Sequence, residues 1–219
     1  MLKAIIFDMD GVIIDSEPLH VEVEKELAEK LGGKLDDELH EKLVGTTDYA
    51  MWSKLKDMFD FKLSVDEIVE IKKDMFIERF DEVQLMDNFR PLVSSLYDEG
   101  YPMAVASSNN RKIVDMIIDR FDLSKYMTFV ISGEEVEKGK PDPEIFLTAA
   151  KKMNVKPEDC LVIEDAANGV KAAKDAGMIC VGLKDIDHGN QDLSDADLII
   201  NNLNELDLNT MKNLFKTFI

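Results

Sequence analysis

Cysteine and positive charge are both scarce in this chain of 219 residues. Only Cys160 and Cys180 occur, each in a stretch predicted as a strand, which favours two small buried hydrophobic residues over a disulfide scaffold or a metal knuckle. Lys and Arg number 26 against 45 Asp and Glu, so the formal net charge is −19. A chain this acidic repels phosphate backbones and anionic lipid. We therefore expect no nucleic acid and no membrane as partners.

Long apolar runs are also missing. No stretch approaches the ~18 apolar residues that a membrane-spanning helix needs, and the N-terminus shows no basic segment followed by a long apolar one. We therefore expect a cytoplasmic protein. With 45% hydrophobic residues, the chain is long enough for a substantial core in one domain, or in one domain with an insertion. The oligomeric state stays open, and a monomer is compatible with the sequence.

The first apolar run, from Ala4 to Phe7, ends abruptly in Asp8 and Asp10, with Gly11 directly after. Four apolar residues bounded by charge are typical of a buried parallel strand, and the glycine indicates a turn. Because side chains alternate along an extended segment, both carboxylates leave the same side, where they repel unless a cation accompanies them. Alternatively, the two acids only cap a turn. This stretch alone favours neither interpretation.

The rest of the chain has two patterns. Residues 16–85 carry helical patterns only, at 18–31, 39–43, 51–59 and 68–80, with no strand run between them. After Pro91, helical patterns at 92–97, 113–121, 143–153 and 169–176 alternate with short apolar runs at 103–106, 129–131, 161–163, 179–182 and 198–200. This alternation predicts an α/β fold, a doubly wound parallel sheet that binds ligands at the carboxyl ends of its strands. Residues 1–15 and 86–219 would form this core, and 16–85 an inserted all-helical cap.

A polar segment follows the strand predicted at 103–106. Ser107, Ser108 and Asn109 offer hydroxyls, an amide and backbone donors that suit an anion. Serine and asparagine are equally favoured at the N-cap of an ordinary helix. Taken by itself, the segment favours the helix N-cap.

Charged residues occur at two further points of the predicted core. Lys140 precedes a proline ahead of a predicted helix, and the restricted backbone would hold it in a defined direction, although a loop lysine is also an ordinary surface charge. Glu164 and Asp165 directly follow the strand at 161–163. If the parallel sheet forms, these side chains should converge on the first pair of acids.

In order and spacing, these segments resemble the four motifs of the haloacid dehalogenase-like hydrolase superfamily. The motifs are Asp8 to Val12, Ser107, Lys140-Pro141 and Glu164-Asp165. The helical insertion after the first motif is similar to the cap of the branch that contains β-phosphoglucomutases and sugar-phosphate phosphatases. The resemblance covers nearly the whole chain and implies a Rossmann-like core with that cap. Four motifs in register are far more specific than any one of them.

The resemblance implies a Mg²⁺-dependent phosphatase that works through an aspartyl-phosphate intermediate. Asp8 would be the nucleophile, and Asp10 would protonate the leaving alcohol and then take a proton from water. Mg²⁺ would be held by Asp8, the backbone carbonyl of Asp10 and Asp165, with Glu164 as an auxiliary ligand. An acid at Asp10 favours phosphoryl transfer over carbon–halogen displacement, because a halide leaves without a proton. The nonbridging phosphate oxygens would be bound by Ser107, the backbone donors of Ser108 and Asn109, and Lys140.

The expected substrate is a small phosphorylated metabolite, in the first place a sugar phosphate, selected mainly by the cap. Where β-phosphoglucomutases carry an arginine, this chain has Asp48, which favours a phosphatase, although Lys72 or Lys73 could partly compensate. A histidine at a helix surface is equally compatible with simple exposure to solvent. The cap candidates for contact with the substrate are Glu17, His20 and Gly45.

Two other functions stay open. One is a β-phosphoglucomutase, which would return the phosphoryl group from Asp8 to a bound sugar phosphate and so interconvert β-glucose 1-phosphate and glucose 6-phosphate. The other is a non-enzymatic signalling module that accepts phosphate on an aspartate, like response-regulator receivers. Those modules also combine strand-end acids, a hydroxyl and a lysine, but they are shorter and lack a helical insertion.

Overall fold

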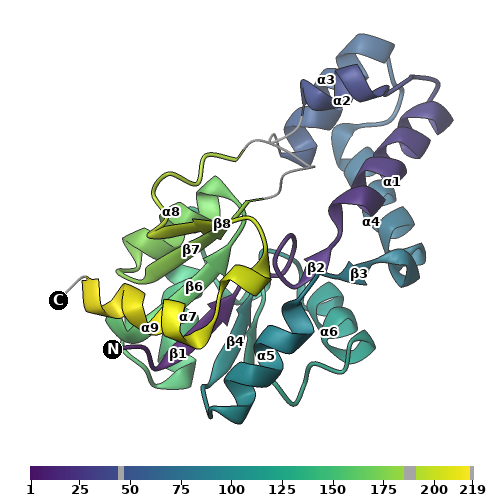
Figure 1. The fold of residues 1–219 in the computed structure, drawn as a ribbon. Coiled ribbons are helices and arrows are strands. Elements are labelled where there is room, and N and C mark those ends of the chain that lie inside the picture. Colours follow the sequence, from purple (N-terminus) through teal and green to yellow (C-terminus); the bar gives the residue numbers. More distant parts are fainter. Residues whose placement is uncertain (44–46, 185–190, 218–219) are drawn as a thin grey trace. The chain divides into compact units, whose positions relative to one another are not determined.

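The computed structural model describes residues 1–43, 47–184 and 191–217 (Figure 1). Its contacts divide the chain into two compact units. The core unit comprises Met1–Asp15 and most of the chain from Leu85 onward, whereas the helical unit is formed by Ser16–Gln84. The core unit therefore combines the N-terminal strand with segments that come after the helical unit in the sequence.

A six-stranded parallel sheet forms the centre of the core unit. Central β1 pairs Ile5 with Met103 on one side and with Leu161 on the other. The chain builds outward from β1 first to one edge and then to the other, so the strand order reverses there and the predicted doubly wound fold is confirmed. The strands lie in the order β5 (Met127–Ile131), β4 (Met103–Ala106), β1 (Ala4–Phe7), β6 (Cys160–Glu164), β7 (Ile179–Leu183) and β8 (Leu198–Ile200).

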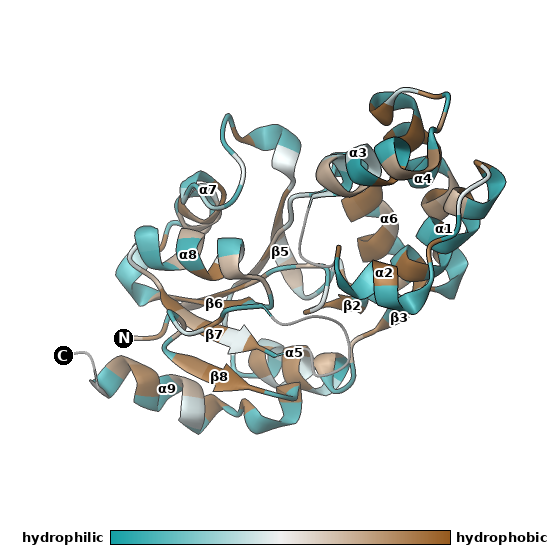
Figure 2. Cartoon of the chain, turned by 90° about the horizontal axis from the view of Figure 1, so that it is seen from above, coloured by the Kyte–Doolittle hydropathy of each residue, from teal (hydrophilic) through white to brown (hydrophobic). Residues whose placement is uncertain are grey.

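Helices cover both faces of this sheet (Figure 2). On one face, Phe146 and Val170 of α7 and α8 join a buried cluster with Ala4 and Ile6 of β1. On the other, the ring of Phe7 meets that of Phe89 in α5 edge to face, with centroids 5.5 Å apart. Because β1 is buried on both sides, all four of its residues are apolar. The helices are α5 (Phe89–Asp98), α6 (Arg111–Arg120), α7 (Glu144–Met153), α8 (Ala167–Asp175) and α9 (Leu208–Thr217), with short 3₁₀ turns at Gly133–Glu135, Pro157–Asp159 and Leu203–Glu205.

The helical unit has its own apolar core. Trp52 and Leu55 of α3 and Ile68 of α4 are fully buried in a cluster with residues of α1. Its helices have clear start signals, since Thr47 caps α3 and Ser64 forms a reciprocal capping box with Glu67 at α4. Its elements are α1 (Glu17–Lys30), α2 (Asp37–Glu41), α3 (Asp48–Phe59), α4 (Val65–Glu78) and a 3₁₀ turn at Phe80–Glu82.

Several boundaries differ from the sequence prediction. Helices α3 and α4 begin three residues before the predicted starts at 51 and 68, because each N-cap lies about one turn ahead of the first buried residue of its helix. The expectation that no strand interrupts residues 16–85 was wrong, since β3 (Gln84–Leu85) pairs with β2 (Ile14–Asp15) in a separate two-stranded sheet. Two-residue strands are too short to produce a periodic pattern. Helix α9 was also missed.

The two cysteines are buried, as their positions in predicted strands indicated. Cys160 and Cys180 are buried free thiols, and burial raises the pKa of Cys160 to about 12 and raises that of Cys180 as well. Thiols that stay protonated are poor nucleophiles. Within the described ranges, every helix is too short or too polar to cross a bilayer.

Candidate active site

The first acid motif lies where central strand β1 ends. The backbone N–H of Asp8 donates to the carbonyl of Ile163 at 2.9 Å, which extends the pairing with β6 by one residue. The chain then folds back, and the N–H groups of Ile13 and Ile14 both donate to the carbonyl of Met9. Gly11, with φ +73°, takes the left-handed conformation that this turn needs. Asp10 is thus held in a tight turn beside the strand end.

Lys140 meets two of the predicted acids. Its ammonium donates to Oδ1 of Asp8, to Oε1 of Glu164 at 2.7 Å and to the carbonyl of Ala106 at 3.2 Å. The side chains of Lys140 and Glu164 are 8% and 1% exposed, so this ion pair is shielded from water. The ring of Phe146 lies 4.9 Å from the ammonium and adds a cation–π contact. Residues 132 positions apart in the sequence are therefore in direct contact.

Burial and like charge dominate the electrostatics of this cluster. Burial raises the pKa of Asp8 to about 8, and the carboxylates of Glu164 and Asp10 add to this, while Lys140 opposes it. Burial, Glu164 and Asp8 together raise the pKa of Asp165 well above its usual range. Burial lowers the pKa of Lys140, but Asp8 and Glu164 outweigh this effect and raise it. One ammonium is too little for four acids, so the cluster favours a further cation.

Three carboxylates stand close enough to share a metal ion. Ligand oxygens of Asp8, Glu164 and Asp165 lie within 4.8 Å of one another. Both carboxylate oxygens of Glu164 already accept hydrogen bonds. Oε1 accepts from Lys140, and Oε2 accepts from the N–H of Ala166 at 2.8 Å. Asp165 occupies space that only a glycine at position 11 leaves open, because a Cβ there would lie 2.2 Å from its Oδ2. An all-oxygen anionic donor set suits Mg²⁺.

The polar segment after β4 is tied to its neighbours through its backbone. The N–H of Ser107 donates to the carbonyl of Ile131, and the N–H of Gly133 donates to the carbonyl of Asn109, each at 3.0 Å. Ser107 is fully buried, and its hydroxyl accepts from the N–H of Asn109 at 3.1 Å. The side-chain amide of Asn109 donates to Oδ2 of Asp10 at 2.6 Å. Ser108 is exposed at the bend.

Sequence reasoning missed Glu144, which shapes the segment before Lys140. Its two carboxylate oxygens accept from the N–H groups of Glu137 and Lys138, each at 3.0 Å. Glu144 lies in the first turn of α7, where the helix dipole also favours an acid. An acid just inside a predicted helix start was the available signal, but a cap and a loop anchor have the same appearance in sequence.

A family model described as haloacid dehalogenase-like hydrolase matches residues 5–183. The chain belongs to this family. It is 34% identical over 181 residues to a phosphorylated carbohydrates phosphatase of Thermotoga maritima, covering 81% of this chain and 82% of that protein. It is 30% identical over 218 residues to a beta-phosphoglucomutase of Bacillus subtilis, covering 94% and 92%. A crystal structure of a HAD hydrolase, family IA, variant 3, from Entamoeba histolytica aligns with TM-score 0.85 at 26% identity, over 98% of this chain and 100% of that one.

These matches confirm the resemblance to haloacid dehalogenase-like hydrolases, but the cap candidates stay predictions. Glu17 is the first residue of α1. His20, one turn later, stacks on Phe76 with ring centroids 4.3 Å apart and an interplanar angle of 11°, so it is half-buried within the helical unit. Gly45 lies outside the described residues.

Proposed function

We propose that this haloacid dehalogenase-like hydrolase removes phosphate from a small phosphorylated metabolite through an aspartyl-phosphate intermediate. The contact of Lys140 with Asp8 and Glu164 supports this proposal most strongly. It places an ammonium beside the carboxylate that would attack phosphorus, at the carboxyl end of the central strand. Asp165 and the Ser107 segment complete the set of groups that phosphoryl transfer needs.

The chain's own residues account for both halves of the reaction. In the first, a carboxylate oxygen of Asp8 bonds to phosphorus, the bond from phosphorus to the alcohol oxygen breaks, and Asp10 donates its proton to that oxygen. In the second, a water oxygen bonds to phosphorus, its proton passes to Asp10, and the bond from phosphorus to Asp8 breaks. Lys140 keeps Asp8 more ionised than burial alone allows and offers positive charge to the phosphate oxygens. Ser107, Ser108 and Asn109 are proposed to bind those oxygens.

The proposed cofactor is Mg²⁺, because the acid cluster fits a hard divalent cation. Asp8 and Asp165 would hold it together with the backbone carbonyl of Asp10. The oxygens of Glu164 accept from Lys140 and from the N–H of Ala166. Glu164 would therefore either position these ligands without binding the ion itself or bind the ion as an auxiliary ligand. Bound there, the ion would offset the repulsion between a carboxylate nucleophile and a phosphate dianion.

We propose a phosphatase rather than a mutase because of the ion pairs in the helical unit. Lys72, which could have compensated for the missing arginine, is buried and pairs with Glu24 at 2.8 Å and with Asp48 at 2.7 Å. Lys73 pairs with Glu70 at 2.6 Å. A mutase needs a free cation for the second phosphate of its bisphosphate intermediate. In this arrangement Lys72 and Lys73 are both held in ion pairs and do not supply that free cation.

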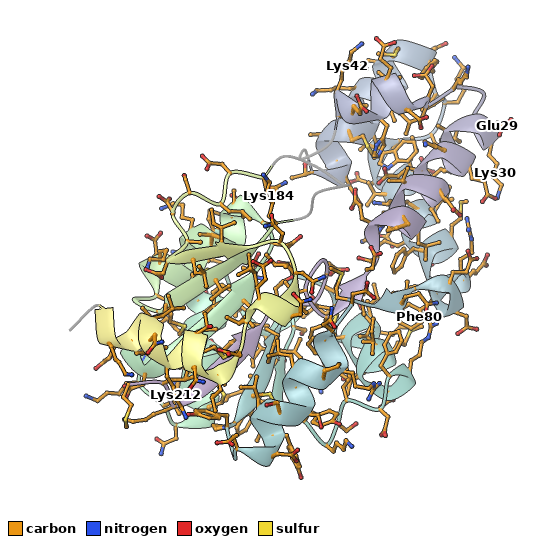
Figure 3. The ribbon with its side chains drawn as sticks, in the orientation of Figure 1. Glu29, Lys30, Lys42, Phe80, Lys184 and Lys212 are labelled. Atoms are coloured by element: carbon orange, nitrogen blue, oxygen red, sulfur yellow. The ribbon has the colours of Figure 1, made fainter. Side chains whose placement is uncertain are left out.

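The overall charge of the helical unit also favours a leaving group without a second anion. Residues 16–84 contain 19 acidic residues against 10 lysines and arginines, and several of these cations are paired with its own acids. Lys30 and Lys42, at the surface of this unit (Figure 3), bind Glu26 at 2.8 Å and Glu38 at 2.7 Å. A monophosphate of a neutral sugar or polyol avoids repulsion from such a unit. The carbohydrate phosphatase of Thermotoga maritima supports the same substrate class.

The test is release of inorganic phosphate from a panel of phosphorylated metabolites in the presence of Mg²⁺, with and without glucose 1,6-bisphosphate. We expect turnover of one or more sugar monophosphates without bisphosphate. Asp8→Asn should reduce turnover to background, whereas Asp98→Asn, at an exposed position at the end of α5, should retain it.

Two results would contradict the proposal and identify the alternatives. A mutase would convert β-glucose 1-phosphate into glucose 6-phosphate only with the bisphosphate present and release little phosphate. A signalling module would accept one phosphoryl group on Asp8 and release none over many turnover times.

A further inference from the structure

We propose that Asn109 is the positioning residue for Asp10, the acid and base of the reaction, and that it links the phosphate-binding segment to proton transfer. The inference rests on the proposed function. The observation that carries it is the bond from the side-chain amide of Asn109 to Oδ2 of Asp10, at 2.6 Å.

The surroundings of Asn109 restrict the orientation of its side chain. Its carbonyl accepts from the N–H of Gly133, and its own N–H donates to the hydroxyl of Ser107. Gly133 packs so closely that a Cβ there would lie 2.5 Å from the carbonyl oxygen of Ser108. The backbone N–H and carbonyl of Asn109 are both hydrogen-bonded, and the segment packs against the residues that follow β5. The backbone is therefore fixed, and this fixes the direction in which the side-chain amide donates to Asp10.

Asp10 needs such a partner because of where it lies. It follows the end of β1, in the turn that closes on the carbonyl of Met9. A carboxyl group that exchanges a proton with two successive oxygen atoms must keep its plane oriented toward both. An amide N–H is a suitable support, since it stays neutral and stays a donor throughout the reaction.

The geometry also gives Asn109 a second connection. Its backbone N–H binds the hydroxyl of Ser107, a proposed phosphate ligand, while its side chain binds Asp10. A phosphate bound at Ser107 is therefore connected to the proton donor through Asn109. The side-chain contact with Asp10 is separate from the backbone contact with phosphate that is predicted for Asn109, whose N–H donates to Ser107 in this structure.

The test compares two esters that differ in their need for an acid. p-Nitrophenolate leaves with little help from a proton, whereas a sugar alkoxide needs one. Because kcat/KM reports only the steps up to loss of the alcohol, slow hydrolysis of the phosphoenzyme does not obscure the comparison. A well-placed general acid contributes about 10²- to 10⁴-fold, so Asn109→Ala should lower kcat/KM by about tenfold or more for the sugar phosphate and less than about threefold for p-nitrophenyl phosphate.

Asn110→Ala is the matched control. Asn110 carries the same amide one position later, but its side chain caps α6 by accepting from the N–H of Ile113 at 3.0 Å. Loss of this cap should lower stability by about 1 kcal/mol and change kcat/KM equally for both esters. Thermal unfolding of both variants checks that neither has lost its fold.

A double-mutant cycle supplies the second readout. If Asn109 acts through Asp10, Asn109→Ala should cost nothing further for the sugar phosphate once Asp10→Asn has been introduced. Equal losses on the two esters, or losses that add fully in the double variant, would overturn the inference and indicate a role in phosphate binding or folding. If the wild-type protein hydrolyses neither ester, the proposed function itself is wrong and the inference falls with it.

Discussion

Replacing Lys140 with methionine would remove the only ammonium that the structure places between Asp8 and Glu164 among the described residues. Methionine keeps much of the length and apolar character of the lysine stem and retains contact with Phe146, so the change acts mainly on charge. Two buried carboxyl groups would then face each other without a counterion. We expect loss of phosphatase activity together with a loss of stability that depends on pH.

The size and sign of the stability loss follow from the protonation of Asp8. The pKa of Asp8 is about 8 in the folded state, far above its value in the unfolded state. At any pH between these two pKa values, the folded state binds more protons than the unfolded state. The free energy of unfolding therefore falls as pH rises through this range. Without the ammonium the folded pKa rises further, and the window extends to higher pH. Breaking a buried ion pair costs about 3–5 kcal/mol when the remaining charge stays ionised. We expect that cost near pH 9, and a smaller one near pH 6, where Asp8 is already protonated in both proteins and only the contact of Lys140 with Glu164 is lost.

Urea denaturation of the metal-free protein at these two pH values measures the difference. Lys152→Met is the matched control, because Lys152 pairs with Glu135 at a partly exposed site. That variant should lose less than about 1 kcal/mol, with no trend in pH. If Lys140→Met costs the same at both pH values, or no more than the control, the electrostatic reasoning about the site is wrong.

Three further predictions concern the proposed metal site and the helical unit. Gly11→Ala should weaken Mg²⁺ binding by about tenfold and destabilise the fold by about 1–3 kcal/mol, because its Cβ would lie 2.2 Å from Oδ2 of Asp165 and its φ of +73° is strained for alanine; unchanged binding by calorimetry would contradict this. Because burial raises the pKa of Asp8 to about 8 and raises that of Asp165 as well, Mg²⁺ must displace protons, so its affinity should rise by up to about tenfold per pH unit below about pH 8. Calorimetry in two buffers of different ionisation enthalpy would detect the released protons, and an affinity independent of pH would refute the ligand assignment. Lys72→Met should cost up to about 3–5 kcal/mol in urea denaturation, because the buried Glu24 would lose its ammonium partner and keep the contact with His40 at 3.1 Å, whereas Lys73→Met next to it should cost less than about 1 kcal/mol. Similar costs for the two variants would show that the buried pair does not stabilise the unit.

Local features of the sequence determined the elements of the core and where chemistry could occur. The four apolar residues from Ala4 to Phe7 are readable as a buried strand because burial on both faces removes polar side chains from such a run. The acids that follow this strand can be predicted as site residues, because parallel strands place their carboxyl ends, and the residues directly after them, at one edge of the sheet. The same rule predicts that Ser107 and Asp165 lie at this edge of the sheet.

Tertiary structure alone decided how those residues bind one another. The contacts of Lys140 with Glu164, of Asn109 with Asp10, and of Glu144 with the segment before Lys140 are set by side-chain directions and loop paths. The order of strands around β1 is likewise absent from any local pattern. Hydrophobic periodicity reports burial along a few neighbouring residues, whereas a hydrogen bond needs two atoms within about 3 Å, a precision that only the packed chain provides.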